Sequence, residues 1–133
     1  MCIRDSNRPR RALVTGGASG LGRACTQRLR AADHDVITVD IADGADHRLD
    51  VTDDEAVGQL IATLEPIDIL LNSAGIVGPN KPLWETTRAE WDATFAVNVH
   101  GTVAMCRAVI PGMVERGWGR IVNFARLHAP HSV

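Results

Sequence analysis

The chain has 133 residues, 45% of them hydrophobic, and a formal net charge of −2. This length and composition allow one globular domain with a hydrophobic core. The slightly acidic balance provides no basic surface of the kind that nucleic acids and anionic membranes attract, so neither is an expected partner. We find no apolar run long enough to span a bilayer. The three cysteines are widely spaced, which favours a reducing, cytoplasmic location over a disulfide or metal framework.

The two ends of the chain carry no periodic pattern. Residues 1–10 are expected to form a disordered leader, in which Arg8 and Arg10, together with Arg11, make a solvated lead-in to the first strand. Residues 126–133 are expected to form an irregular tail. The folded domain is therefore predicted to occupy residues 11–125.

Apolar runs and helical periodicity alternate between these ends. The predicted elements, in chain order, are a strand at 11–14, a helix at 20–32, a strand at 36–39, a weaker strand at 47–51, a helix at 56–64, a strand at 67–71, a helix at about 89–116 and a strand at 120–124. Strands that alternate with helices imply a parallel sheet with right-handed crossovers. Continuously apolar strands suit a sheet that is covered on both faces. The predicted fold class is therefore α/β, with a doubly wound parallel sheet.

Helix faces, caps and tryptophans indicate how these elements pack. The first helix has apolar residues at helical spacing, which predicts one buried stripe. The members of this stripe are Leu21, Ala24, Cys25, Leu29 and Ala32. Thr52 or Asp53 is expected to cap the second helix. Trp91 and Trp118 are expected to anchor the long helix, whereas Trp84 lies in the long preceding loop and is a candidate substrate contact.

A glycine-rich turn, Thr15-Gly16-Gly17-Ala18-Ser19-Gly20-Leu21-Gly22, joins the first strand to the first helix. Glycine tolerates positive φ and lets a phosphate approach the backbone where a Cβ would block it. The helix that follows directs its free N–H groups and its positive dipole end at the turn. Any tight turn could use glycines, but this position predicts a dinucleotide pyrophosphate site. The residues assigned to it are Gly16, Ser19, Gly20, Leu21 and Gly22.

Asp40 ends the second predicted strand. A carboxylate at this place can accept hydrogen bonds from the adenosine ribose diol and repels a 2′-phosphate. Neither Ala18 nor Ser19 nor Ile41 offers a compensating cation. The sequence therefore favours NAD over NADP, the alternative being a solvated aspartate at a strand end.

Further motifs follow the turn in a fixed order. They are Asp50-Val51, Asn72-Ser73-Ala74-Gly75, Asn98-Val99-His100-Gly101 and Gly119-Arg120-Ile121-Val122-Asn123. Together with the turn, they resemble the T-G-x-x-x-G-x-G, D-V, N-N-A-G, N-V-x-G and fifth-strand segments of the short-chain dehydrogenase/reductase family. Ser73 replaces the second asparagine of N-N-A-G. The resemblance covers nearly the whole chain, from about residue 11 to residue 124.

The resemblance implies a Rossmann-like sheet with strand order 3-2-1-4-5. It also implies hydride transfer between a nicotinamide cofactor and an alcohol or ketone, with the cofactor supplying the difficult chemistry. Asp50 would contact the adenine, with Val51 beside it. Asn72, Ala74 and Gly75 would shape the cofactor cleft at the carboxyl ends of the strands.

The catalytic residues of the family are only partly matched. In the resemblance, a tyrosinate is the general acid/base, a lysine lowers its pKa, a serine positions the substrate oxygen and an asparagine organises a water. Asn98 matches the asparagine. The sequence contains no tyrosine, the serine position falls at Arg126, and no Tyr-x-x-x-Lys pair follows. We therefore expect the chain as given to be truncated after the fifth strand and to be inactive.

The last residues offer no substitute for the missing groups. Ser132 comes too late in the chain to match the family serine. His128 and His131 lack an acidic or cysteine partner, so no metal site is predicted.

Three functions remain open. The first is the cofactor-binding part of an NAD-dependent oxidoreductase acting on a small alcohol or ketone, with a 3-oxoacyl-like or sugar- or polyol-like substrate. The second is a non-catalytic NAD-binding module, and the third is a methyl-donor-binding α/β domain, against which the turn and Asn98 argue. The resemblance implies that the full-length form is a homo-oligomer, assembled in part through apolar residues of the long helix. These residues are Val97, Val103, Val109, Ile110, Met113 and Val114.

Overall fold

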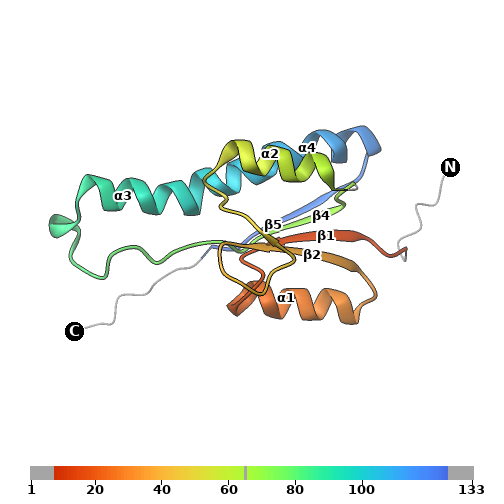
Figure 1. Cartoon of the computed structure of the whole chain (residues 1–133), viewed down its shortest axis with the longest axis horizontal. Helices are drawn as coiled ribbons and strands as arrows, with labels where there is room; N and C mark the ends of the chain where they lie inside the picture. Colours follow the sequence, from red (N-terminus) through yellow and green to blue (C-terminus); the bar gives the residue numbers. More distant parts are fainter. Residues whose placement is uncertain (1–7, 65, 126–133) are drawn as a thin grey trace.

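The computed structural model describes residues 8–64 and 66–125 (Figure 1). The elements are β1 (Arg11–Thr15), α1 (Gly20–Ala31), β2 (Asp35–Asp40), β3 (His47–Arg48), α2 (Asp54–Thr63), β4 (Ile69–Asn72), the 3-10 turn η1 (Leu83–Glu85), α3 (Arg88–Phe95), the π-helical turn η2 (Ala96–Gly101), α4 (Thr102–Arg116) and β5 (Arg120–Asn123). The strands form one sheet in the order β3-β2-β1-β4-β5, and every pair is parallel. The predicted α/β fold with strand order 3-2-1-4-5 is confirmed.

The register of the central strands brings their carboxyl ends to one edge of the sheet. Thr15, the last residue of β1, pairs with Val39 of β2 on one side and with Asn72 of β4 on the other. Asn72 pairs in turn with Asn123, the last residue of β5. Loops that leave these strands therefore start side by side, which is where ligands bind in open α/β sheets.

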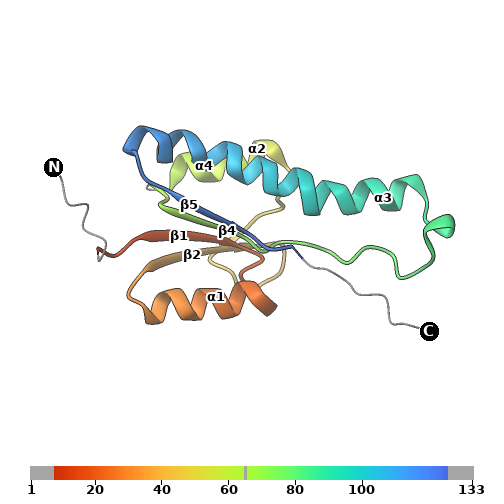
Figure 2. The same cartoon turned by 180° about the vertical axis from the view of Figure 1, so that it is seen from behind.

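Helices cover both faces of the sheet, with α1 on one face and α2 and α4 on the other (Figure 2). Side chains of a strand alternate between faces, so β1 contributes to two cores. The core under α2 and α4 consists of Leu13, Val39, Leu49, Val51, Val57, Ile67, Leu70, Met105, Val109 and Met113. The core under α1 consists of Ala12, Val14, Val36 and Leu71, with Cys25 and Leu29 packed against it. β1 is therefore covered on both of its faces.

Two predicted helix features have different outcomes. Asp53 caps α2 as expected, because its carboxylate accepts the backbone N–H of Ala56 at 2.9 Å. The predicted stripe of α1 is only partly buried. Cys25 and Leu29 contact the core, whereas Leu21 is 55% exposed. Leu21 lies in the first turn of the helix.

The third strand is shorter than the predicted 47–51, since β3 contains only His47 and Arg48. After them, the carboxylate of Asp50 accepts hydrogen bonds from the backbone N–H of Thr52 at 2.9 Å and from its hydroxyl at 2.7 Å. An aspartate that bonds to its own backbone two residues on favours a turn over an extended ladder. This local turn ends the strand.

Arg10 is not part of a solvated lead-in, because it is only 7% exposed. Its backbone N–H donates to His34 Nδ1 at 3.1 Å, and its guanidinium carbon lies 3.8 Å from the centre of the Trp118 ring. Trp118 therefore packs as an anchor. Trp91, by contrast, is 46% exposed and stacks on Phe95 at 5.2 Å. The remaining leader residues 1–7 and the tail 126–133 lie outside the described residues.

The long predicted helix is continuous but not uniform, since the π-helical turn η2 separates α3 from α4. It begins with a reciprocal cap in which Thr87 and Glu90 exchange side-chain-to-backbone hydrogen bonds. The ammonium group of Lys81, 2.8 Å from Glu90 Oε1, and the backbone N–H of Thr87 lower the pKa of Glu90. Pro111 lies within α4.

By length and composition alone, the helix Arg88–Arg116 could cross a membrane. The sequence shows no continuous apolar run there, because polar residues interrupt the apolar positions. Met105, Val109 and Met113 of α4 are nevertheless buried against the sheet. The helix therefore covers a face of the sheet. Of the apolar residues of the long helix, Val109 and Met113 therefore belong to the core and not to its outer surface.

The same continuous helix also carries exposed apolar side chains, which we call the α3–α4 stripe. Its members are Trp91, Phe95, Val99, Val103, Ile110 and Val114. Their spacing of mostly four residues places them along one side of the helix. In the described part of the chain, β5 also forms an edge of the sheet, with Val122 44% exposed.

Replacing Leu13 tests the importance of the double-sided packing of β1. Leu13 is completely buried in the core under α2 and α4. We expect Leu13→Ala to lower the free energy of unfolding by about 2–5 kcal/mol, as a large-to-small change in a core does. Urea denaturation measures this difference. Leu83→Ala removes the same atoms from a side chain that is 70% exposed and should change the free energy of unfolding by less than about 0.5 kcal/mol. Equal losses for the two variants would contradict the assignment.

Candidate functional site

The glycine-rich turn packs directly against the loop that follows β4. Gly16 has a φ of +63°, and a Cβ placed on it would lie 2.9 Å from the backbone nitrogen of Ala74. A Cβ on Gly22 would collide with the carbonyl oxygen of Gly16. Gly16 therefore excludes a side chain through its positive φ and its contact with Ala74, and Gly22 excludes one through its contact with Gly16. The turn leaves its backbone accessible to a ligand, as a phosphate cradle requires.

The first turn of α1 has no capping side chain among the described residues. Ser19 occupies the N-cap position in extended conformation, yet its side chain accepts no hydrogen bond from the helix. No acidic residue lies in the first turn. The N–H groups at the start of a helix have no partner within the helix, so those of Gly20, Leu21 and Gly22 can bind an anion, which the helix dipole also favours.

Thr15 holds the two loops together. Its hydroxyl oxygen accepts the backbone N–H groups of Ser73, at 3.1 Å, and of Ala74, at 3.0 Å. Thr15 itself is 1% exposed. The sequence analysis did not identify this bridge, although the threonine immediately before the first glycine could have suggested it. The hydroxyl fixes the glycine-rich turn relative to the segment after β4.

Asp40 is also tied to the turn. Its Oδ2 accepts the backbone N–H of Ala18 at 3.1 Å, and its Oδ1 accepts that of Ala42 at 3.0 Å. Asp40 is therefore more than a solvated aspartate at a strand end. A carboxylate has about four lone-pair positions, so two remain for the hydroxyls of a ligand.

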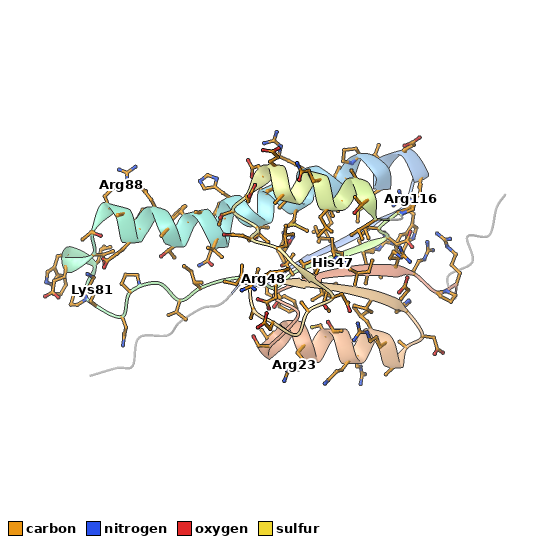
Figure 3. The ribbon with its side chains drawn as sticks, viewed as in Figure 1. Arg23, His47, Arg48, Lys81, Arg88 and Arg116 are labelled. Atoms are coloured by element: carbon orange, nitrogen blue, oxygen red, sulfur yellow. The ribbon has the colours of Figure 1, made fainter. Side chains whose placement is uncertain are left out.

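An arginine that the sequence analysis did not consider lies near the turn. Arg23 lines a hollow of about 230 Å³ together with Gly17, Ala18 and Arg30. Arg30 already donates to the carbonyl of Val36 at 3.1 Å and pairs with Asp46 at 3.4 Å. Ala18, Ser19 and Ile41 carry no charge, but Arg23, which Figure 3 shows at the start of α1, places a cation beside the turn.

Asn98 connects the π-helical turn to the loop after β4. Its Oδ1 accepts the N–H of Ile76 and its Nδ2 donates to the carbonyl of Ile76, both at 2.8 Å. Gly75 lies beside it, since a Cβ on Gly75 would be 3.2 Å from Asn98 Oδ1. π-Helical turns occur frequently at functional sites. Here the turn directs the amide of Asn98 to the loop that also contacts the glycine-rich turn.

Asn72 lies deeper than the other predicted site residues. It is 4% exposed, and its Nδ2 donates to Asn123 Oδ1 at 2.8 Å, with Cys106 Sγ at 3.6 Å. Among the described residues its Oδ1 has no hydrogen-bond partner. Asn72 thus links β4 to β5 through its side chain. The backbone of Ala74, two residues later, contacts the glycine-rich turn at Gly16.

The remaining predicted residues lie in the loop after β3 and in η1. Val51 is buried in the core and lies against Gly101, on which a Cβ would be 2.5 Å from Val51 Cγ2. Asp50 is exposed and is engaged by Thr52. Trp84 is 85% exposed on η1, between Lys81 and Arg88, which Figure 3 places at the far end of α3. The structure gives Trp84 no contact with the other site residues.

No metal centre is formed by the part of the chain that the structure describes. Three or more His, Cys, Asp or Glu side chains do not come together there in a way that could hold an ion. His128, His131, Arg126 and Ser132 fall outside the described residues.

Three comparisons with known proteins bear on this geometry. Residues 16–133 match the family described as enoyl-(acyl carrier protein) reductase. The chain is 38% identical over 130 residues to the 2-dehydro-3-deoxy-L-rhamnonate dehydrogenase (NAD(+)) of a Sphingomonas strain, covering 86% of this chain and 52% of that protein. The fold matches the short-chain dehydrogenase from Streptomyces avermitilis with a TM-score of 0.80 and 33% identity, covering 87% of this chain and 49% of that one.

A second solved structure, the closed form of serine dehydrogenase complexed with NADP+, matches with a TM-score of 0.77 and 34% identity over 85% of this chain and 52% of that one. The chain thus spans about half the length of the relatives it matches. One of these relatives is named for NAD(+) and the other was solved with NADP+, so the comparisons do not choose between the two cofactors. The family match, the relatives and the order of the strands agree: the chain belongs to the short-chain dehydrogenase/reductase family, whose members named here are oxidoreductases.

Proposed function

We propose that the chain is the cofactor-binding part of an NAD-dependent oxidoreductase that transfers hydride between the nicotinamide and the carbon of an alcohol or ketone. One observation carries the proposal. The first turn of α1 has no side-chain cap, and it begins at Gly20, where even an added Cβ would meet no other atom within 4 Å. Such a helix start binds a pyrophosphate without further groups. The bound cofactor would supply the hydride chemistry.

Each predicted cofactor residue has a role in this proposal. The N–H groups of Gly20, Leu21 and Gly22 would bind the pyrophosphate, with Gly16 and Ser19 lining the turn. Asp40 would accept hydrogen bonds from the adenosine ribose. This assignment is supported by the two carboxylate positions that Ala18 and Ala42 leave open.

The opposite wall of the site would come from the loops after β3 and β4. Asp50 and Val51 would border the adenine. Ala74 and Gly75 would border the nicotinamide half, with Asn72 fixing the strand beneath them. This arrangement is supported by the contact of Gly16 with Ala74, which sets the two loops side by side.

Asn98 would organise a water in a proton relay. The two hydrogen bonds to Ile76 occupy its amide group, so the side chain would position the loop while the backbone of the π-helical turn meets the water. A π-helical turn supports this because its backbone carbonyls depart from the regular helical ladder.

The substrate class follows from the relatives. We assign a 3-oxoacyl-like or a sugar- or polyol-like alcohol or ketone, because the family description names an acyl carrier protein reductase and one relative is named for a deoxy sugar acid. The two free thiols of the described chain, Cys25 and Cys106, fit a reducing cytoplasm.

The chain as given should bind NAD without turning it over, because it contains no tyrosine to serve as the proton donor. Calorimetric titration should show one NAD per chain. Absorbance of reduced cofactor should not change when sugar alcohols or 3-hydroxyacyl thioesters are added. Binding without turnover, even in a version extended with a relative's carboxyl-terminal half, would favour a non-catalytic module. Binding of S-adenosylmethionine in place of NAD would contradict the proposal.

Asp40 and Arg23 should determine the choice between NAD and NADP. Asp40→Asn keeps an oxygen for the Ala18 N–H and removes the charge that repels a 2′-phosphate. We expect the ratio of NADP to NAD affinity to rise about tenfold, equivalent to roughly 1.4 kcal/mol. Asp92→Asn makes the same change on exposed α3 and should leave the ratio unchanged. If the wild-type chain binds NADP more tightly than NAD, and Arg23→Gln removes that preference, the NAD assignment is wrong.

The α3–α4 stripe should be the surface through which the full-length form assembles with a second copy. Its exposed side chains are distributed along most of the helix, from Trp91 to Val114. Val103→Glu places a charge in the stripe and should shift sedimentation from oligomer toward monomer, because burying an unpaired charge is unfavourable. Val77→Glu, at a loop position that is 73% exposed, is the matched control. A monomer in wild type, or equal behaviour of both variants, would contradict this surface.

A further inference from the structure

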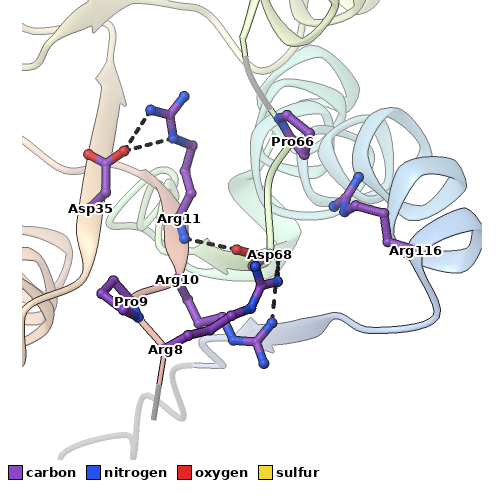
Figure 4. A pocket seen from close by; sticks show the side chains of 8 residues that line it. All are labelled: Arg8, Pro9, Arg10, Arg11, Asp35, Pro66, Asp68 and Arg116. Atoms are coloured by element: carbon purple, nitrogen blue, oxygen red, sulfur yellow. Dashed lines mark hydrogen bonds and ion pairs between the residues drawn. The ribbon is translucent and has the colours of Figure 1, made fainter. Parts of the chain in front are cut away.

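A second polar hollow lies at the amino ends of the strands, opposite the edge that carries the cofactor site. It has a volume of about 330 Å³ and is bordered by the starts of β1 and β2, the segment before β4 and the end of α4 (Figure 4). Its described lining residues are Arg8, Pro9, Arg10, Arg11, Asp35, Pro66, Asp68 and Arg116. Four arginines and two aspartates are therefore among the described residues that line the hollow.

Arg10 is the key residue of this hollow. Its side chain is 8% exposed, and the guanidinium lies flat on Trp118 at 3.8 Å. The nearest carboxylate oxygen, Asp68 Oδ1, is 4.0 Å away, which is an ion pair but not a hydrogen bond. Among the described residues, the guanidinium has no hydrogen-bond acceptor. Arg10 lines the hollow, so its unused donors can bind an anion there, and hydrogen bonds between charged groups are stronger than neutral ones.

Asp68 cannot satisfy the arginines around it. Its Oδ2 accepts the backbone N–H of Arg11 at 3.0 Å. Its Oδ1 lies 3.6 Å from the Arg8 guanidinium, again beyond hydrogen-bond distance, while it also faces Arg10. One carboxylate is thus shared loosely between two guanidinium groups.

The other two arginines differ in how strongly they are held. Arg11 is paired closely with Asp35, its Nε 2.7 Å and its Nη2 2.6 Å from Asp35 Oδ2. Arg116 gives one hydrogen bond, from Nη2 to the carbonyl of Ile67 at 2.6 Å. Figure 4 shows Arg116 reaching from α4 toward Pro66. A guanidinium has five N–H donors, so Arg116 retains donors for a ligand.

We propose that this hollow binds a phosphate group, held by Arg8, Arg10 and Arg116. A phosphate carries two charges near neutral pH and several acceptor oxygens, and the planar fork of arginine matches such oxygens with two parallel hydrogen bonds. The volume of about 330 Å³ admits a small phosphorylated molecule as well as the free ion. The site is independent of the cofactor proposed above, because it lies at the other edge of the sheet.

Calorimetric titration with inorganic phosphate at constant ionic strength tests the proposal. We expect a dissociation constant below about 1 mM and no measurable heat from chloride or acetate at the same concentrations. Titration with a sugar phosphate separates the two sources of the ligand. Tighter binding than inorganic phosphate indicates a phosphorylated metabolite, and equal binding indicates the free ion. Phosphate heat no larger than that of chloride would overturn the site.

Substitutions of the exposed Arg8 and of the buried Arg10 test whether phosphate binds in this hollow. Arg8 is 55% exposed, so Arg8→Gln should fold normally and weaken phosphate binding about tenfold, as the loss of one charge-assisted hydrogen bond of roughly 1.4 kcal/mol predicts. Arg10→Lys keeps the charge but loses the fork and should weaken binding by a similar factor. Arg88→Gln on α3 is the matched control. Affinity for NAD should be unaffected in Arg8→Gln. Unchanged phosphate affinity in both pocket variants, or an equal loss in Arg88→Gln, would refute the proposal.

Discussion

The hydroxyl of Thr15 connects the two loops on which the candidate cofactor site depends. β1 lies in the middle of the sheet, so its last residue has β2 on one side and β4 on the other. By accepting the N–H groups of Ser73 and Ala74, Thr15 keeps the loop after β4 against Gly16. Asn98 then fixes the outer part of the same loop through Ile76. The glycine-rich turn, the loop after β4 and Asn98 are thereby held together by Thr15 and by the hydrogen bonds of Asn98 to Ile76.

The two edges of the sheet differ in chemistry. The carboxyl edge presents backbone N–H groups, a helix start and the carboxylate of Asp40, which together suit a dinucleotide. The amino edge presents arginines whose charges are compensated incompletely by Asp35 and Asp68. Both edges favour anions, but by different means: oriented backbone dipoles at one and guanidinium groups at the other. The outer side of α3 and α4 adds a third kind of surface, which is apolar.

Local patterns in the sequence were sufficient for the alternation of strands and helices, for the cap at Asp53 and for the glycine-rich turn, because each depends on residues close together in the chain. The strand order followed from the family resemblance. Features that depend on distant residues could not be predicted. Arg10 is buried because Trp118 lies over it, and the hydrophilic leader gave no sign of this. The early end of β3 has a local cause instead, since Asp50 bonds to Thr52 and this turn competes with the strand pattern of 47–51. The bridge from Thr15 and the place of Arg23 near the turn likewise required the packed structure.

Backbone amide NMR of the isotope-labelled chain during titration with NAD would test the placement of the cofactor most directly. If the carboxyl edge binds the dinucleotide, the amide signals of Gly16, Gly20, Gly22 and Ala74 should shift progressively and saturate together, while those of Arg10 and Asp68 stay in place. Shifts confined to the amino edge, or an unchanged spectrum at millimolar NAD, would contradict a dinucleotide site at the glycine-rich turn.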